Sequence, residues 1–122
     1  MLGYCTIGSN DVPQAGKFFD GIASVLGHGR MAETDKFIMW GTPGKGAMMA
    51  VITPANGEPA TVGNGSMFGL HADSEEQIHQ VYDYAIAHGG SDEGPPGPRG
   101  DNFYGAYFRD PDGNKLVVFL MK

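Results

Sequence analysis

Apolar and polar positions in the first fifty residues follow two spacings, one typical of strands and one typical of helices. The segment "LGYCTIGS" reads as a strand, and Asn10 or Asp11 can then cap a helix with Pro13 in its first turn. Gly27 is a natural end for this helix, because glycine readily adopts the left-handed conformation found there. Three short strands follow, at about 29–33, in "KFIMW" and in "GAMMAVI". The apolar face of the helix consists of Val12, Phe18, Phe19, Ile22, Val25 and Leu26.

The second half of the chain has the same order of elements. "SMFGLHA" reads as a strand, and Ser74 with Gln77 forms a capping-box pattern that opens a second helix. Gly89–Gly90 ends this helix, and a short strand comes next. "FYGAYFR" and "KLVVFLM" are two further strands joined by the turn "DPDGN". The apolar face of the second helix consists of Ile78, Val81, Tyr82 and Ala85.

Landmarks of the first half recur 63 positions further along. The matched pairs are Tyr4 with Met67, Asp11 with Ser74, and Gly27 with Gly90. We therefore predict one domain, 1–122, built from two β-α-β-β-β modules at about 1–55 and about 66–122, with a linker at about 56–65. Each module has one helix packed against an antiparallel sheet, so the fold class is α+β.

Composition narrows the class of protein. The chain has 122 residues, which suits a single compact domain, and its net charge of −6 disfavours contact with a phosphate backbone. We therefore expect no nucleic-acid partner. Its single cysteine excludes an intrachain disulfide and a multi-thiolate metal site. No apolar run approaches the ~20 residues of a membrane helix, so we expect a cytoplasmic protein without a membrane partner.

The duplication, together with "YGAYFRDPDGNKLVVF", resembles the vicinal oxygen chelate superfamily, which includes glyoxalase I, the bleomycin and fosfomycin resistance proteins and the extradiol dioxygenases. The resemblance extends over essentially the whole chain. It implies two modules whose sheets curl into a cup that holds a small ligand. In catalytic members it also implies a divalent metal that acts as a Lewis acid. Its ligands are a His or Gln on the first strand, an acid or His on the fourth, a His on the fifth and a Glu on the eighth.

None of these four strand positions carries a usual ligand here. By resemblance, the first-strand position matches Tyr4, the fifth-strand position Met67 and the eighth-strand position Val117. The fourth strand, "AMMAVI", contains no His, Asp or Glu. Because Tyr, Met and Val together do not make a site for a hard cation, we predict no bound metal and no other cofactor.

One apparent motif and two histidines lie outside these strand positions. "GTPGKGAMM" has a Gly-Lys pair but lacks the spacing and the Ser or Thr of a P-loop. His28 follows a helix end and can interact with the carbonyls there. His71 should share a strand face with Met67, because side chains alternate along a strand.

We predict that the cup is lined by apolar and aromatic surface with a few polar groups, a common composition of small-molecule sites. Arg99 and Tyr104 lie in or beside "SDEGPPGPRGDNFYG", which can form a lid where the guanidinium meets an anionic group and the phenol ring stacks. An extended surface loop explains this segment equally well, and the cup residues can also simply fill a core. The predicted ligand-binding residues are Tyr4, Trp40, Met67, His71, Arg99, Tyr104 and Val117.

The leading hypothesis is a metal-free member of the superfamily that binds a small organic molecule. One alternative is a metal-dependent glyoxalase-like lyase or dioxygenase whose ligands lie elsewhere. Another is a non-catalytic structural or interaction domain with a packed cup. A homodimer is a further expectation, favoured by sheet edges exposed where the modules meet.

Overall fold

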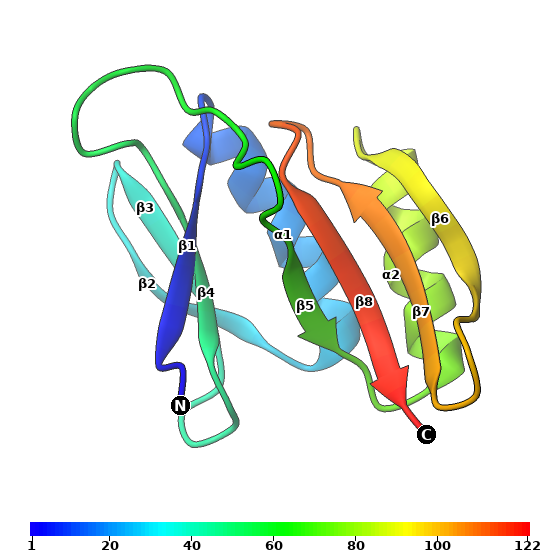
Figure 1. Cartoon of the computed structure of the whole chain (residues 1–122). Helices are drawn as coiled ribbons and strands as arrows, with labels where there is room; N and C mark the ends of the chain where they lie inside the picture. Colours follow the sequence, from blue (N-terminus) through cyan, green and yellow to red (C-terminus); the bar gives the residue numbers. More distant parts are fainter.

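The structure is a computed structural model that describes residues 1–122. Two four-stranded sheets stand side by side, and the two helices lie together on one side of them (Figure 1). Neither helix is long and apolar enough to cross a membrane. The elements are β1 (Tyr4–Gly8), α1 (Val12–Leu26), β2 (Gly29–Glu33), β3 (Phe37–Gly41), β4 (Met48–Ile52), β5 (Phe68–His71), α2 (Glu75–Ala87), β6 (Ser91–Pro98), β7 (Phe103–Arg109) and β8 (Lys115–Met121).

The strand orders confirm the predicted duplication of one folding unit. The first sheet has the order β1-β4-β3-β2 and the second the order β5-β8-β7-β6, which is the same order in the second module. The sheets are mixed rather than purely antiparallel, because β1 pairs in parallel with β4 and β5 pairs in parallel with β8. Each helix returns the chain from the first strand of its module to the far edge of the sheet, which leaves the middle of the sheet for the last strand.

The helices begin and end where the sequence predicts. The side chain of Asp11 accepts a hydrogen bond from the backbone N–H of Gln14, and Gly27 ends α1 in the left-handed conformation. The Ser74 hydroxyl accepts from the backbone N–H of Gln77 at the start of α2. These caps satisfy backbone groups that a helix end would otherwise leave unpaired.

The segment that was predicted as a short strand followed by a loop is one long strand, β6. It pairs antiparallel with β7, and its register shifts at two places, around Gly94. Three of its eight residues, Pro95, Pro96 and Pro98, lack a backbone N–H. Strand β6 can include them because it is the outermost strand of its sheet, where one row of backbone groups needs no partner.

Each sheet has one face against the helices and one open face. The core lies on the helix side, and its buried side chains form one cluster drawn from both modules. Phe18 of α1 joins the modules, since its ring lies 6.4 Å from the ring of Tyr84 in α2 and 6.4 Å from that of Phe108 in β7. The largest fully buried apolar side chains are Phe19, Phe108, Ile22, Ile78, Leu116, Val51, Val81 and Val118.

The turn between β7 and β8 connects the second module to the first by hydrogen bonds. Asn114 is only 9% exposed, and its Nδ2 donates to the carbonyl of Gly8 (2.9 Å) and to Oδ2 of Asp110 (3.0 Å). Oδ1 of Asp110 accepts from the backbone N–H groups of Asp112 and Asn114. Burial raises the pKa of the Asp110 carboxyl, against the lowering effect of these hydrogen bonds.

The inner strands β1 and β5 each have one unpaired edge, and the two sheets share no strand pair. Exposed edges at the junction of the modules are the feature on which the homodimer expectation depends. That expectation stays a prediction.

Replacing Asn114 by alanine should destabilise the protein by about 1–3 kcal/mol, because the Gly8 carbonyl and the Asp110 carboxylate each lose a buried donor. Chemical unfolding followed by circular dichroism measures this. The matched control is Asn64→Ala, at an exposed position without a side-chain hydrogen bond, where we expect a change within about 0.5 kcal/mol. Equal effects of the two substitutions would contradict the role of Asn114.

Gly21→Ala should also destabilise the fold, although alanine is normally the better helix former by up to about 1 kcal/mol. A Cβ at Gly21 would lie 2.0 Å from the ring of Tyr84, so the ring would have to leave its place or the two helices would have to separate. In a Tyr84→Ala background the same Gly21→Ala change should become neutral or stabilising, because the ring that it meets is gone. A double-mutant cycle of unfolding free energies measures the coupling. Additive effects would show that the helices do not depend on this contact.

Candidate functional site

The three predicted ligand-binding residues at the superfamily's metal-ligand positions lie on the open faces of the sheets. Tyr4 of β1 is 58% exposed and Met67, just before β5, is 45% exposed. Val117 of β8 lies on the open face of the second sheet, but it is buried there by its neighbours. A Cβ placed on Gly69 or Gly105, which flank it on β5 and β7, would touch its methyl groups. Tyr4 and Met67 therefore face solvent, whereas Val117 forms part of a sheet floor.

An aromatic row crosses the open face of the second sheet. The rings of Phe103 and Phe119 are stacked with centroids 5.4 Å apart, and His71 meets Phe119 edge-on at 5.9 Å. Beside this row, the Arg99 guanidinium lies over the Tyr107 ring at 5.6 Å, and the Lys115 ammonium lies 5.7 Å from the same ring. His71 and Arg99, both predicted site residues, thus belong to one face with Val117, and Arg99 lies against β7.

The residues on the strand positions of the superfamily's metal site do not fit a divalent metal. Tyr4 is paired with Met48 on β4, and the β4 residues on the same face as Tyr4 are Met48, Ala50 and Ile52. These side chains supply no carboxylate or imidazole, and neither do Met67 and Val117. Within the chain, no group of three or more His, Cys, Asp or Glu side chains could hold a metal ion. The side chains at these positions are thus one phenol, thioethers and alkyl groups, which do not form a site for a hard cation.

Trp40 and Tyr104 point to the helix side of their sheets rather than to the open side. Trp40 is 3% exposed, and its ring lies 5.6 Å from the ring of Phe19 in α1. Its indole N–H donates to Oδ1 of Asp20 at 2.9 Å, and the same carboxylate accepts two hydrogen bonds from Arg30, each 2.8 Å long. Tyr104 packs against the core and bonds through its hydroxyl to the Nε2 of His79 at 2.8 Å.

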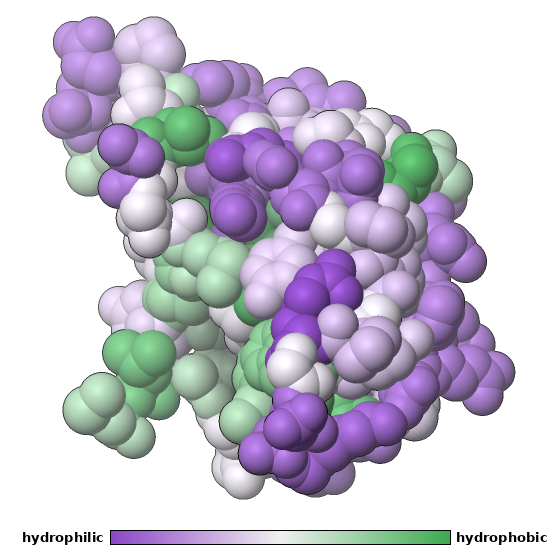
Figure 2. Space-filling view, turned by 45° about the vertical axis from the view of Figure 1, so that its right-hand side comes forward, coloured by the Kyte–Doolittle hydropathy of each residue, from purple (hydrophilic) through white to green (hydrophobic).

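A cleft of about 600 Å³ lies between the two modules. The C-terminal half of α1, the ends of β3 and β4 with the turn that joins them, and β5 surround it. Of the predicted residues, only Trp40 and His71 line it. Figure 2 shows a hollow flanked by apolar atoms, in green, beneath a polar rim. The apolar side chains in its lining are Phe19, Ile22, Ala23, Leu26, Trp40, Ala47, Met49 and Leu70.

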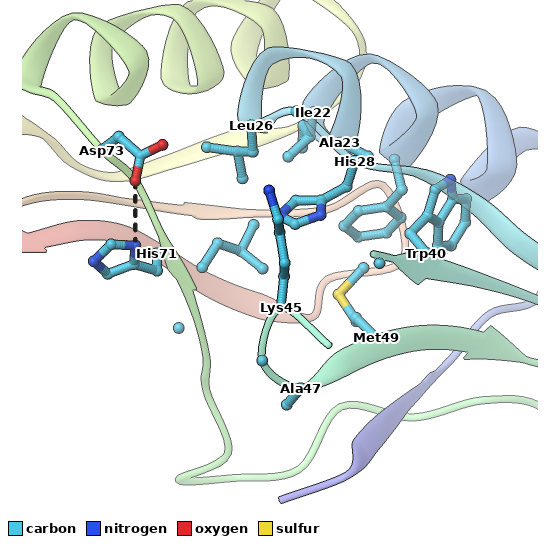
Figure 3. A pocket seen from close by; sticks show the side chains of 16 residues that line it. Ile22, Ala23, Leu26, His28, Trp40, Lys45, Ala47, Met49, His71 and Asp73 are labelled. Atoms are coloured by element: carbon cyan, nitrogen blue, oxygen red, sulfur yellow. Dashed lines mark ion pairs between the residues drawn. The ribbon is translucent and has the colours of Figure 1, made fainter. Parts of the chain in front are cut away.

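Four side chains with titratable groups interrupt this apolar lining (Figure 3). The Nδ1 of His28 is 2.7 Å from the hydroxyl of Thr42, so the imidazole contacts the β3–β4 turn. The backbone N–H of His28 donates to the carbonyl of Ala23 at the end of α1. His71 and Asp73 lie together at the opposite side of the cleft, with the Nδ1 of His71 3.9 Å from Oδ1 of Asp73. Lys45 extends from the turn across the opening.

Sequence reasoning did not assign Lys45 and the end of α1 to a site. The signal for Lys45 was "GTPGKG", in which the glycines and proline indicate a turn and the lysine is the only charged residue. What the letters do not reveal is that this turn packs opposite β5, more than twenty residues away along the chain.

Two mixed sheets of the order 1-4-3-2, each backed by one helix, with a cleft between them, define a protein of the paired β-α-β-β-β class. Residues 1–118 match the model of the glyoxalase/bleomycin resistance protein/dioxygenase superfamily, and the chain belongs to that superfamily. The recognised resemblance and the predicted fold class are therefore confirmed. No curated protein matches the chain.

Solved structures agree with this assignment. A glyoxalase/bleomycin resistance protein from Albidiferax ferrireducens is 38% identical, with a TM-score of 0.90 over 98% of this chain and 97% of the other. A glyoxalase/bleomycin resistance protein/dioxygenase family enzyme from Burkholderia phytofirmans is 18% identical, with a TM-score of 0.76 over 99% and 98% of the two chains. A putative glyoxalase from Bacillus halodurans is 16% identical, with a TM-score of 0.79 over 98% and 94%. The last two show the fold alone.

The Asp20 network beside the cleft should make stability depend on pH. Hydrogen bonds from Arg30 hold the pKa of Asp20 below its ordinary value of 3.8; burial opposes them and the Trp40 bond assists them. A carboxyl with a lowered folded-state pKa stabilises the fold above its unfolded pKa, and this contribution is lost as pH falls through the folded value. Asp20→Asn should therefore be less stable than the wild type at pH 7, by a margin that shrinks below about pH 4.

Urea unfolding at several pH values measures that margin. Asp35→Asn, in the exposed turn between β2 and β3, removes one carboxylate without a side-chain partner and serves as the control. A margin for Asp20→Asn that is constant from pH 7 to pH 3 would contradict the proposed contribution.

Proposed function

We propose that this member of the glyoxalase/bleomycin resistance protein/dioxygenase superfamily binds a small organic molecule in the cleft between its modules, without a divalent metal. The observation that carries the proposal is the cleft itself. Its volume of about 600 Å³ lies within the usual range for small-molecule sites, roughly 300–1,000 Å³. Half of the residues that line it are hydrophobic, and a few convergent polar groups stand at its opening.

The alternatives have less support. A metal-dependent lyase or dioxygenase needs a donor set, and the strand positions for it carry Tyr4, Met67 and Val117, with only Met, Ala and Ile facing the same way on β4. A structural domain with a packed cup needs side chains that fill the space between the modules, and here that space is open. Binding followed by sequestration and binding followed by metal-independent chemistry are both compatible with the cleft.

The chain has a natural reporter for such binding, because Trp40 is its only tryptophan and lines the cleft. A screen of small organic molecules should find compounds that change Trp40 fluorescence and raise the unfolding temperature. A ligand at 100 times its dissociation constant stabilises the folded state by about 2.7 kcal/mol.

Ala47→Phe should reduce or abolish the response to these compounds, because the added ring projects from an exposed lining position into the cleft. Ala87→Phe adds the same ring at the exposed end of α2, outside the cleft, and should leave the response unchanged. Compounds that bind equally well to both variants would place binding elsewhere, and a screen without any ligand would favour the structural alternative.

A further inference from the structure

The cleft contains one charged side chain that has no partner in the protein. Lys45 forms no ion pair, although it lies at the opening of an otherwise half-apolar site. The ammonium cannot be offset by a carboxylate of its own turn, because the residues from Gly41 to Ala47 include no Asp or Glu. The ion pairs of the chain are Arg30–Asp20, Arg30–Glu33, His71–Asp73, Arg109–Glu93 and Lys122–Glu75.

The backbone holds Lys45 at this place by a defined turn. Pro43 is followed by Gly44 at a φ of 76°, and the backbone N–H of Lys45 donates to the carbonyl of Thr42 at 3.0 Å. Proline and then a left-handed glycine inside such a hydrogen bond is the pattern of a type II turn, in which Lys45 is the last residue. Thr42 is itself anchored to α1's end through its hydroxyl contact with His28. Two contacts of Thr42 therefore hold the turn that carries Lys45.

The direction of the side chain agrees with a role inside the cleft. Figure 3 shows Lys45 extending from its turn toward α1, with its nitrogen beside His28 in this view. The imidazole of His28 uses Nδ1 for Thr42, which leaves Nε2 without a partner. In the same view Leu26 and Ile22 lie above these two nitrogen-bearing groups, and Trp40 and Met49 lie to the right. Polar and apolar surface are thus separated within one cleft.

Two negative features of the cleft oppose the binding of an anion. The end of α1 carries about half a negative charge, which the N–H groups of Gly27 and His28 partly satisfy by bonding to carbonyls of its last turn. Asp73 is mostly solvent-exposed, so water screens its charge, and its carboxylate lies 3.9 Å from the Nδ1 of His71. Lys45 is exposed to solvent as well, but no carboxylate of the protein pairs with its ammonium. An anion placed at Lys45 would therefore gain a partner, while Asp73 lies beside His71 at the opposite side of the cleft.

We infer that the molecule bound in the cleft is an amphipathic anion. Its aromatic or branched apolar body lies against Trp40 and Met49, and its single negative group, a carboxylate or sulfonate, lies at Lys45. This inference rests on the proposed function, because it requires that the cleft is a binding site. It goes further by naming the chemical class of the ligand and the residue that selects it.

A matched pair of fluorescent probes tests the class of ligand. Anilinonaphthalene sulfonate and phenylnaphthylamine have the same aromatic body, and only the first carries a negative group. Both become brighter in apolar surroundings, so one titration format gives both dissociation constants. The sulfonate should bind the wild-type protein more tightly than the neutral probe by about fivefold, the size expected for one partly screened ion pair.

Variants at the turn then identify the cation. Lys45→Gln should weaken the sulfonate by about fivefold and leave the neutral probe unchanged, and Lys45→Arg should restore the difference. Lys36→Gln, in the exposed turn between β2 and β3, removes the same charge outside the cleft and should change neither probe. Both positions are on exposed turns, and circular dichroism checks that each of the three variants is folded.

The possible outcomes separate this inference from the proposed function. If both probes bind equally, Lys45→Gln has no effect and Ala47→Phe prevents binding of both, the ligand class is wrong while the cleft remains a binding site. If Ala47→Phe leaves the binding of both probes intact, or if neither probe binds, the cleft is not the site and both proposals fail. A preference for the sulfonate that Lys45→Gln removes, and Lys36→Gln does not, supports the inference.

Discussion

Contact between the two helices determines how the two halves of this molecule stand relative to each other. The sheets share no strand pair, so backbone hydrogen bonding between them cannot set their separation. The helices meet at Gly21 and Tyr84, where the absence of a side chain on α1 leaves room for the ring on α2. The phenol of Tyr84 also donates to the carbonyl of Lys17. The width of the cleft therefore depends on helix packing together with the hydrogen bonds of the β7–β8 turn to β1. A change at the Gly21–Tyr84 contact should alter the cleft although neither residue lines it.

The fold and the chemistry of this superfamily are separable in this chain. The hydrogen bonds of the β7–β8 turn to β1, the helix caps and the shared core need none of the residues that would hold a metal. The apolar side chains on β4 beside Tyr4, and Val117 on β8, are therefore compatible with the architecture. A fold that tolerates such exchanges can host different sites, which is why the function must be argued from the site and not from the architecture.

Much of the fold could be predicted from local signals in the sequence. The caps at Asp11 and Ser74, the stop at Gly27 and the turn "DPDGN" each act within a few residues, and the duplication repeats them. The parallel pairing of β1 with β4 was harder to foresee, because it joins strands about forty residues apart whose side-chain alternation is the same in either direction. The length of β6 was missed since its prolines normally argue against a strand, and only its outer position allows them.

The candidate site was less predictable than the fold, for a physical reason. Alternation along β3 correctly separates two faces, but it does not say which face meets the helix; Trp40 shares its face with buried Ile38 and therefore points to α1. The cleft arises where the ends of several elements from both modules converge, and no single segment carries its pattern. His71 was identified because it shares the strand face of Met67, whereas Lys45 depends on where a turn docks in three dimensions.

The prolines of β6 have a consequence for how copies of this chain can associate. A strand at the outside of a sheet is a template on which further strands can add, and this is a common route to aggregation. Because Pro95, Pro96 and Pro98 lack a backbone N–H, the outer edge of β6 has too few hydrogen-bond donors to pair with another strand. A further strand can therefore pair with the second sheet at β5, the edge that faces the first module, but not at β6.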